Sequence, residues 1–279
     1  MNDTHFTVQA SAPHTHTVVF LHGRGGSART LAQSLLYSKH SDGRTLFAIF
    51  PSFRWVFPEA NKNECAAFPG QSMQQWFDIW NVQDFSNREE LQAVGLRKSV
   101  GLIRGVIADE ARALGGRYDR VFLAGISQGA ATSVHTLLNL NIPPPAEGGA
   151  SRGLAAFLGF SCRMPFPGRT LSDTRKILGL DDVPSDDVTI KNTPILLEHC
   201  IDDPLVLVGN GRVLRDTLRG FGATVHWLEY PDGGHWFNSP AGITDAAAFL
   251  THIIKSQGFE VGTQAQPQAQ APTDEMDLS

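Results

Sequence analysis

The sequence predicts an α/β fold with a mostly parallel central sheet and helices on both of its faces. Unbroken apolar runs alternate along the chain with helical patterns, as they do in βαβ units. The runs lack the strict polar alternation of a half-exposed strand, which indicates strands buried on both faces. The chain has 279 residues, of which 42% are hydrophobic and 18% charged, so it can bury a sizeable core.

The expected strands are short runs rich in β-branched and aromatic residues. They cover 17–21, 46–50, 121–124, 154–158, 195–197 and 224–230. Open α/β sheets bind their ligands at the carboxyl ends of such strands. Candidate functional residues are therefore sought just after these runs.

Helical patterns fill the segments between the strands. Apolar residues recur every three to four positions over 89–114, and Gly115-Gly116 provides a stop. A helix of small residues is expected over 128–140, ahead of consecutive prolines. Two further helices are expected at 210–220 and 241–256.

Some segments depart from this alternation. Residues 50–80 are rich in aromatic residues and proline, and residues 161–193 in Pro, Asp and Ser, so both are expected to be functional loops. We expect residues 1–14 to be a flexible N-terminal segment or an edge strand. A single α/β domain is expected over 15–256. The Gln-, Ala- and Pro-rich stretch 257–279 is expected to be a disordered tail.

Composition excludes several classes of protein. A formal net charge of −5 without a run of Lys or Arg argues against nucleic-acid binding. The three cysteines have neither disulfide-framework nor metal-ligand spacing, so we expect neither a metal nor a cofactor. There is no signal peptide and no long apolar stretch, which predicts a cytoplasmic protein without a transmembrane segment. The oligomeric state is left open.

A G-x-S-x-G motif carries the chemistry. In Gly125-Ile126-Ser127-Gln128-Gly129 the apolar strand leads in and the small-residue helix leads out. That strand–turn–helix setting is the one a nucleophile elbow requires, with the serine exposed on a sharp turn. Glycines on both sides remove Cβ atoms that would collide with the neighbouring backbone. The sequence therefore predicts Ser127 as a catalytic nucleophile.

A serine nucleophile needs a base, which in turn is oriented by an acid. Among the ten histidines, His235 lies in a turn directly after strand 224–230. Asp202 and Asp203 both follow strand 195–197 and both suit the acid by position. Pro204 favours an extended conformation at Asp203, in a turn rather than a helix.

The glycine-rich turn after the first strand completes the pattern. His22-Gly23-Arg24-Gly25-Gly26 can direct a backbone N–H to the same point as the N–H of Gln128. A phosphate-binding loop is the competing interpretation, but the turn contains neither Gly-Lys-Ser/Thr nor G-x-G-x-x-G.

Taken together, these segments resemble the phospholipase/carboxylesterase family, which includes acyl-protein thioesterases. The motifs that carry the resemblance are Leu21-His22-Gly23, Gly125-Ile126-Ser127-Gln128-Gly129, His199 to Val206, Gly234-His235, Phe57-Pro58-Glu59-Ala60 and Trp76-Phe77-Asp78. The resemblance covers roughly residues 15–256. It implies an α/β-hydrolase fold without a large separate cap domain, and a serine hydrolase of carboxylic esters or thioesters.

The same resemblance implies the site residues. Ser127 would be the nucleophile, Asp203 the acid and His235 the base, and the backbone N–H groups of Arg24 and Gln128 would form an oxyanion hole. The family usually has Leu in place of Arg24 and Gly in place of Cys200. A guanidinium at position 24 would favour anionic substrates.

The aromatic segments suggest an apolar acyl channel, with Trp76, Phe77 and Trp236 as candidate substrate-binding residues. Ordinary packing against the sheet is the alternative explanation for these side chains. The expected partner is an acyl ester or thioester, with acylated proteins and lipids as candidates. A small-ester carboxylesterase of a specialised pathway and a catalytically silent, hydrolase-like binding protein are the alternative functions.

Overall fold

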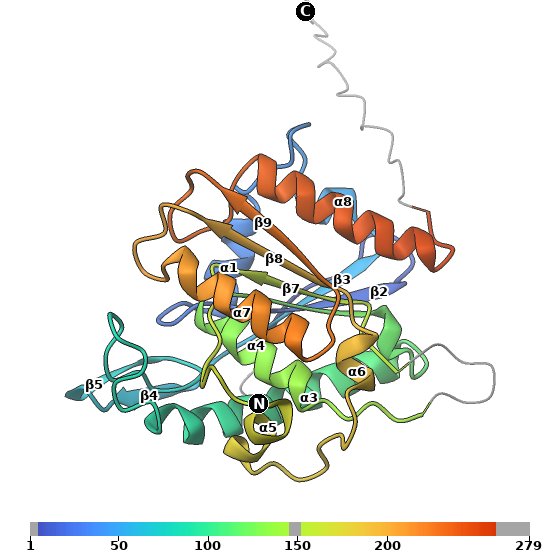
Figure 1. Cartoon of the computed structure of the whole chain (residues 1–279). Coiled ribbons are helices and arrows are strands. Elements are labelled where there is room, and N and C mark those ends of the chain that lie inside the picture. Colours follow the sequence, from blue (N-terminus) through green and yellow to red (C-terminus); the bar gives the residue numbers. More distant parts are fainter. Residues whose placement is uncertain (1–4, 145–151, 261–279) are drawn as a thin grey trace, which may run out of the picture.

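A seven-stranded sheet forms the centre of the computed structural model, which describes residues 5–144 and 152–260 (Figure 1). Its strands are β1 (His5–Val8), β2 (His16–Leu21), β3 (Phe53–Pro58), β6 (Val121–Ile126), β7 (Ala156–Phe160), β8 (Ile195–Cys200) and β9 (Val225–Tyr230). Across the sheet their order is β1-β3-β2-β6-β7-β8-β9. Only β1 is antiparallel to its neighbour, so a parallel sheet carries one antiparallel edge strand.

The register aligns the carboxyl ends of the middle strands. Gly125 of β6 lies opposite Leu21 of β2 on one side and Gly159 of β7 on the other. On the next pair, Phe160 of β7 lies opposite Glu198 of β8. The turns that follow β2, β6, β7 and β8 therefore emerge at one edge of the sheet.

Helices cover both faces of the sheet (Figure 1). They are α1 (Ala28–Leu35), α2 (Leu46–Ile49), α3 (Leu91–Ala113), α4 (Gln128–Leu138), α5 (Leu171–Leu178), α6 (Val188–Lys191), α7 (Val208–Gly220) and α8 (Ala241–Ser256). A 3-10 turn, η1 (Tyr118–Arg120), precedes β6. Helices α1, α2 and α8 pack on one face, and α3, α4 and α7 on the other.

Each strand feeds both cores because its side chains alternate between the two faces. In β2, Val19 and Leu21 join the core beneath α3 and α4. Val18 and Phe20 join the core beneath α1 and α8. All four side chains are almost fully buried, which explains why the strand reads as an unbroken apolar run.

The expected strand at 46–50 was wrong. Residues 46–49 form helix α2, which starts where the Thr45 side chain accepts a hydrogen bond from the Ala48 N–H. Leu46 and Ile49 are buried at helical spacing. A short apolar run does not distinguish a strand from a buried helix. The strand, β3, instead lies inside the aromatic segment 50–80.

Both segments that were expected to be loops contain regular structure. After β3, strands β4 (Lys62–Cys65) and β5 (Phe68–Gln74) form a separate antiparallel hairpin. The 161–193 segment contains α5 and α6. Part of the N-terminal segment pairs with β3 as β1, the edge-strand alternative.

The ordered domain continues past α8. His16 donates to the side-chain oxygen of Gln257 over 2.9 Å, and its ring centroid lies 4.9 Å from that of Phe259. The Arg120 guanidinium lies 4.8 Å from the centroid of the Phe259 ring. Burial lowers the pKa of His16 to about 4, so its imidazole is neutral at pH 7. The rest of the expected tail, from 261 onward, lies outside the described residues.

None of the helices in the described parts of the chain has the length and hydrophobicity needed to cross a membrane.

The packing of Phe259 predicts a measurable contribution to stability. Phe259→Ala removes a half-buried ring that contacts His16 and Arg120 and is expected to lower the free energy of unfolding by about 1–2 kcal/mol. Phe68→Ala is the matched control, since Phe68 is 55% exposed on β5 and its loss should cost less than about 0.5 kcal/mol. Urea unfolding measures both. Equal effects would show that Phe259 does not dock on the domain.

Candidate active site

Ser127 occupies a strained turn between β6 and α4. Its φ of 56° and ψ of −123° lie outside the regions that non-glycine residues usually adopt. The Ser127 N–H donates to the Phe160 carbonyl of β7 over 2.9 Å, and its own carbonyl accepts from the Ala131 N–H over 3.0 Å. The turn is thus held from both sides, as persistent backbone strain requires.

Two glycines allow this turn to form. A Cβ on Gly125 would lie 2.5 Å from the Ala130 nitrogen. A Cβ on Gly129 would lie 2.4 Å from the carbonyl oxygens of both Leu21 and His22. Real Cβ atoms do not approach backbone this closely, so α4 can pack against the end of β2 only because position 129 is glycine.

Asp203 and His235 form a partly buried hydrogen-bonded pair. The Nδ1 atom of His235 lies 2.8 Å from Oδ2 of Asp203. The other carboxylate oxygen of Asp203 accepts the backbone N–H groups of Leu205 and Val206, each over 2.9 Å. The Asp203 side chain is fully buried, whereas that of His235 is 19% exposed. This arrangement leaves Nε2 of His235 free to face the cavity that also contains Ser127.

The carboxylate of Asp203 stays ionised despite its burial. Burial alone would raise the pKa of Asp203, but hydrogen bonds from His199, His235 and the backbone hold that pKa well below its usual range. Asp202 has a different role. Its Oδ1 atom accepts the Gly234 N–H over 2.8 Å and so fixes the loop that carries His235.

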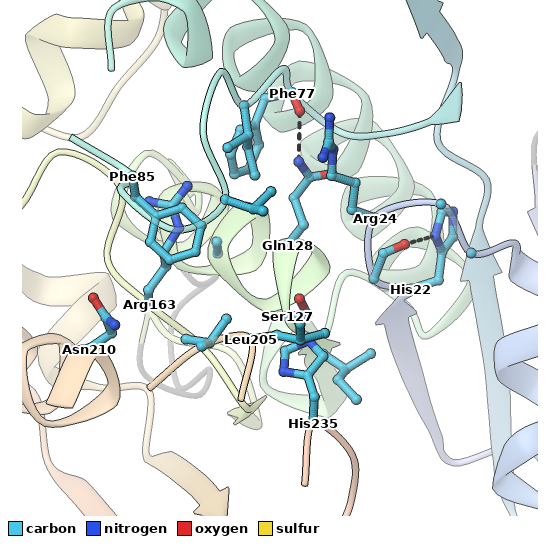
Figure 2. A pocket seen from close by; sticks show the side chains of 18 of the residues that line it. His22, Arg24, Phe77, Phe85, Ser127, Gln128, Arg163, Leu205, Asn210 and His235 are labelled. Atoms are coloured by element: carbon cyan, nitrogen blue, oxygen red, sulfur yellow. Dashed lines mark hydrogen bonds between the residues drawn. The ribbon is translucent and has the colours of Figure 1, made fainter. Parts of the chain in front are cut away.

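His22 shapes the glycine-rich turn after β2. Its Nε2 atom accepts the Ala60 N–H over 3.1 Å, so the proton of the neutral ring is on Nδ1. Nδ1 therefore donates to the Gly23 carbonyl over 2.7 Å, a bond drawn in Figure 2. Burial lowers the pKa of His22, which keeps the ring neutral.

Gln128 joins α4 to the aromatic segment. Its side-chain oxygen accepts the Trp76 N–H over 2.9 Å, and its side-chain nitrogen donates to the Phe77 carbonyl over 2.7 Å. Within the described residues, the backbone N–H groups of Arg24 and Gln128 have no hydrogen-bond partner. Both belong to residues that line the cavity beside Ser127. Two free donors at that point can stabilise negative charge on a substrate oxygen.

A cavity of about 1070 Å³ lies above these groups. Figure 2 shows Ser127 and the His235 ring next to each other in the wall of this cavity. Phe77 and Phe85 lie in a part of the wall further from these two residues. Much of the wall is apolar. Such a cavity can enclose an acyl chain while leaving the reacting bond at Ser127.

Among the candidate substrate-binding residues, Phe77 and Trp236 line the cavity, but Trp76 does not. Trp76 is 1% exposed and its Nε1–H donates to the His22 carbonyl over 2.7 Å. These contacts favour the packing alternative for Trp76. The sequence could not separate these neighbours because both belong to the same aromatic segment.

The Arg24 side chain turns toward the β4–β5 hairpin. Its Nε donates to Oε1 of Gln75 over 3.0 Å, and its Nη2 lies 3.9 Å from the sulfur of Cys65. In Figure 2 its guanidinium lies beside the Gln128 side chain, away from Ser127. The side chain thus braces the turn against the hairpin.

Sequence reasoning missed Arg163, which also lines the cavity. Arg163 follows β7, which lies between β6, the strand before Ser127, and β8, the strand before Asp203. Its position after the carboxyl end of a central strand was the signal that could have identified it as a cavity residue. That signal was hidden because residues 161–193 were assigned as a whole to a loop. His199, whose Nε2 lies 3.4 Å from Asp203, was likewise passed over.

Comparison with known proteins identifies the family. The sequence profile of the phospholipase/carboxylesterase family matches residues 2–254, nearly the whole chain. The chain belongs to the phospholipase/carboxylesterase family. Membership places it among the α/β-hydrolases and among the enzymes that hydrolyse carboxylic ester or thioester bonds.

Several proteins similar to this chain are acyl-protein thioesterases or carboxylesterases by name. An acyl-protein thioesterase 1 of Schizosaccharomyces pombe is 28% identical over 199 residues, which cover 71% of this chain and 73% of that protein. The carboxylesterase SOBER1 of Arabidopsis thaliana is 27% identical over 218 residues, covering 78% of this chain and 82% of its own. Acyl-protein thioesterase 2 of Zea mays, a solved structure, superimposes with a TM-score of 0.66 at 22% identity and covers 90% of this chain and 98% of its own.

The close approach at Gly129 generates a prediction for this phospholipase/carboxylesterase family member. Gly129→Ala should push α4 away from β2, lower the free energy of unfolding by about 1–3 kcal/mol and reduce kcat, because Ser127 and the Gln128 N–H move with the helix. Gly101→Ala in α3 is the control. A Cβ there meets nothing within 4 Å, so this change should stabilise by about 0.5–1 kcal/mol. Indistinguishable variants in urea unfolding would contradict the assigned contact.

Proposed function

We propose that the chain hydrolyses carboxylic esters or thioesters through an acyl-enzyme formed on Ser127. His235 is the base and Asp203 the orienting acid. The Ser127 hydroxyl gives its proton to Nε2 of His235 as Oγ bonds to the substrate carbonyl carbon. The alcohol or thiol then leaves with that proton. A water molecule activated by His235 next attacks the acyl-enzyme, releases the carboxylic acid and restores Ser127.

Asp203 would act through His235. A carboxylate that accepts the Nδ1 proton holds Nε2 toward the serine and stabilises the imidazolium that forms during attack. The two backbone donors on its other oxygen fix the carboxylate in one orientation. Protonation of the acid does not compete with this role near neutral pH, since the pKa of Asp203 lies well below its usual range.

The oxyanion hole in this proposal consists of the backbone N–H groups of Arg24 and Gln128. The Gln128 N–H lies at the first position of α4, where helix N–H groups lack intrahelical partners and the helix dipole favours negative charge. The Arg24 N–H lies in the turn held by His22. Donors fixed before the reaction lose no energy in reorganising as the charge develops.

The observation that carries the proposal is the joint placement of Ser127, His235 and a free-donor turn in one cavity, with Asp203 bonded behind the imidazole. The strained Ser127 turn adds support, because such strain concentrates at functional sites. A catalytically silent binding protein would have no use for this costly arrangement.

The substrate class follows from the cavity and the relatives. A volume of about 1070 Å³ exceeds the need of a small ester, which favours a longer acyl group over a small-ester specialist. Relatives named acyl-protein thioesterase make acylated proteins candidates, alongside acylated lipids. A cytoplasmic location remains part of this proposal. All three cysteines are free and buried, as a reducing compartment permits.

The nucleophile can be tested directly. Ser127→Ala should lower kcat on a neutral p-nitrophenyl ester by about 10⁴-fold or more, because the acyl-enzyme cannot form. Alanine fits the same turn, so the melting temperature should stay close to that of the parent. A fluorophosphonate probe should label the parent and not the variant. Labelling of the variant, or activity within tenfold of the parent, would assign the nucleophile elsewhere.

The acid can be tested with adjacent residues. Asp203→Asn is expected to reduce kcat by about 10³- to 10⁴-fold, since the amide favours the wrong imidazole tautomer. Asp202→Asn should have an effect of less than about tenfold, because the amide oxygen still accepts the Gly234 N–H. Steady-state kinetics on one ester ranks the two. The reverse ranking would transfer the role of acid to Asp202.

A further inference from the structure

Arg163 is a buried cation in the wall of the proposed acyl cavity. Only 6% of its surface is exposed, and it lies after β7, at the same sheet edge as Ser127 and Asp203. Figure 2 shows Arg163 beside Phe85, on the side of the cavity away from His22. A long side chain on an ordinary acyl channel would extend its charge to solvent, but this one is covered.

No carboxylate forms a direct ion pair with this guanidinium among the described residues. Within the described residues, no Asp or Glu oxygen lies within ion-pair distance of it. Glu89 also lines the cavity, and its charge acts to raise the pKa of Arg163, but it makes no direct contact with the guanidinium and its Oε1 accepts the Phe166 N–H over 2.8 Å. Burial raises the pKa of Cys162 to about 12, so the neighbouring thiol is not an anion. Burial lowers the pKa of Arg163 only to about 10, so the side chain is charged at neutral pH.

The Arg163 side chain is held in place and still has N–H groups that can donate to a ligand. Its Nη2 donates to Oε1 of Gln92 over 2.8 Å. Its Cζ lies 4.0 Å from the ring centroid of Phe85 and 5.7 Å from that of Phe77, so the aromatic faces support the charge. A guanidinium has five N–H donors, and within residues 5–144 and 152–260 only Gln92 accepts a hydrogen bond from it. An oriented, unpaired cation of this kind is completed by a carboxylate that arrives with the substrate.

We propose that Arg163 is a specificity-determining residue that binds a carboxylate carried by the ester or thioester substrate within the cavity. This inference rests on the proposed hydrolysis at Ser127. A singly charged carboxylate fits better than a phosphate dianion, because one guanidinium with Glu89 also in the cavity wall does not balance two negative charges. Arg24 does not fill this role, since it is half-exposed and bonded to Gln75.

The test compares substrates that differ only in one charge. In the acyl arm, the p-nitrophenyl half-ester of suberic acid is compared with the p-nitrophenyl ester of its monoamide, which has the same shape and no charge. In the alcohol arm, 4-(octanoyloxy)benzoate is compared with 4-(octanoyloxy)benzamide. Half-esters of shorter and longer dicarboxylic acids vary the distance between the ester carbonyl and the carboxylate. The readout is the ratio of kcat/KM for the acid to kcat/KM for the amide.

The parent is expected to prefer the carboxylate in one of the arms by about 10- to 100-fold, the range of a charge-assisted hydrogen bond. Arg163→Met should reduce that ratio to near one, because the carboxylate loses its counter-charge, whereas the amide carries no charge that needs one. Arg163→Lys should retain part of the preference, since it keeps the charge and loses the planar donors. Arg112→Met is the control, because Arg112 is exposed at the end of α3 and its loss should leave the ratio unchanged.

Because both rates come from one preparation, partial unfolding of a variant cancels in the ratio. If Arg163→Met does not fold, the ratio measured for the parent still tests whether the cavity prefers a carboxylate. A parent that hydrolyses the amides but prefers the carboxylate in neither arm overturns the role of Arg163 and leaves the proposed hydrolysis intact. A preference that survives in Arg163→Met assigns it to another residue. A parent inactive on every ester contradicts the proposed function itself.

Discussion

The contact between the first turn of α4 and the end of β2 is the constraint on which the rest of the site depends. Gly129 lets the helix approach the Leu21 and His22 carbonyls, and Gly125 admits the helix from the other side. That approach puts Ser127 in its strained conformation and aims the free N–H of Gln128 at the cavity. Strain of this kind persists only where surrounding contacts outweigh it. Here the backbone bond from Ser127 to Phe160 and the packing of α4 provide them.

Around this contact, buried polar side chains connect segments that are distant in sequence. Trp76 donates to the His22 carbonyl, and Gln128 binds the backbone of Trp76 and Phe77 on both sides. His22 in turn holds Ala60 and Gly23. Each bond satisfies a buried group that would otherwise be costly. The aromatic segment is therefore part of the support of the site as well as part of the cavity wall.

Sequence alone was sufficient for the architecture and for the segments that carry the site. The parallel strands could be predicted from apolar runs because both of their faces are buried. The nucleophile elbow could be predicted because its strand, glycines and helix follow one another directly in the sequence. Residues 46–49 were misassigned because a four-residue apolar helix has the same composition as a strand. Trp76 and Arg163 could not be placed because their roles depend on which way a side chain points. That is set by packing between segments far apart in the chain, which periodicity does not encode.

The β4–β5 hairpin lies outside the central sheet but is bonded to the turn after β2. The Gly25 N–H donates to the Gln74 carbonyl over 2.7 Å, and the Arg24 side chain donates to Gln75. Met73, on the same strand, lines the cavity. These bonds fix the hairpin to the turn that carries the Arg24 N–H. The conformation of the backbone on either side of the Arg24 N–H is therefore coupled to the position of the two exposed strands, although those strands lie outside the central sheet.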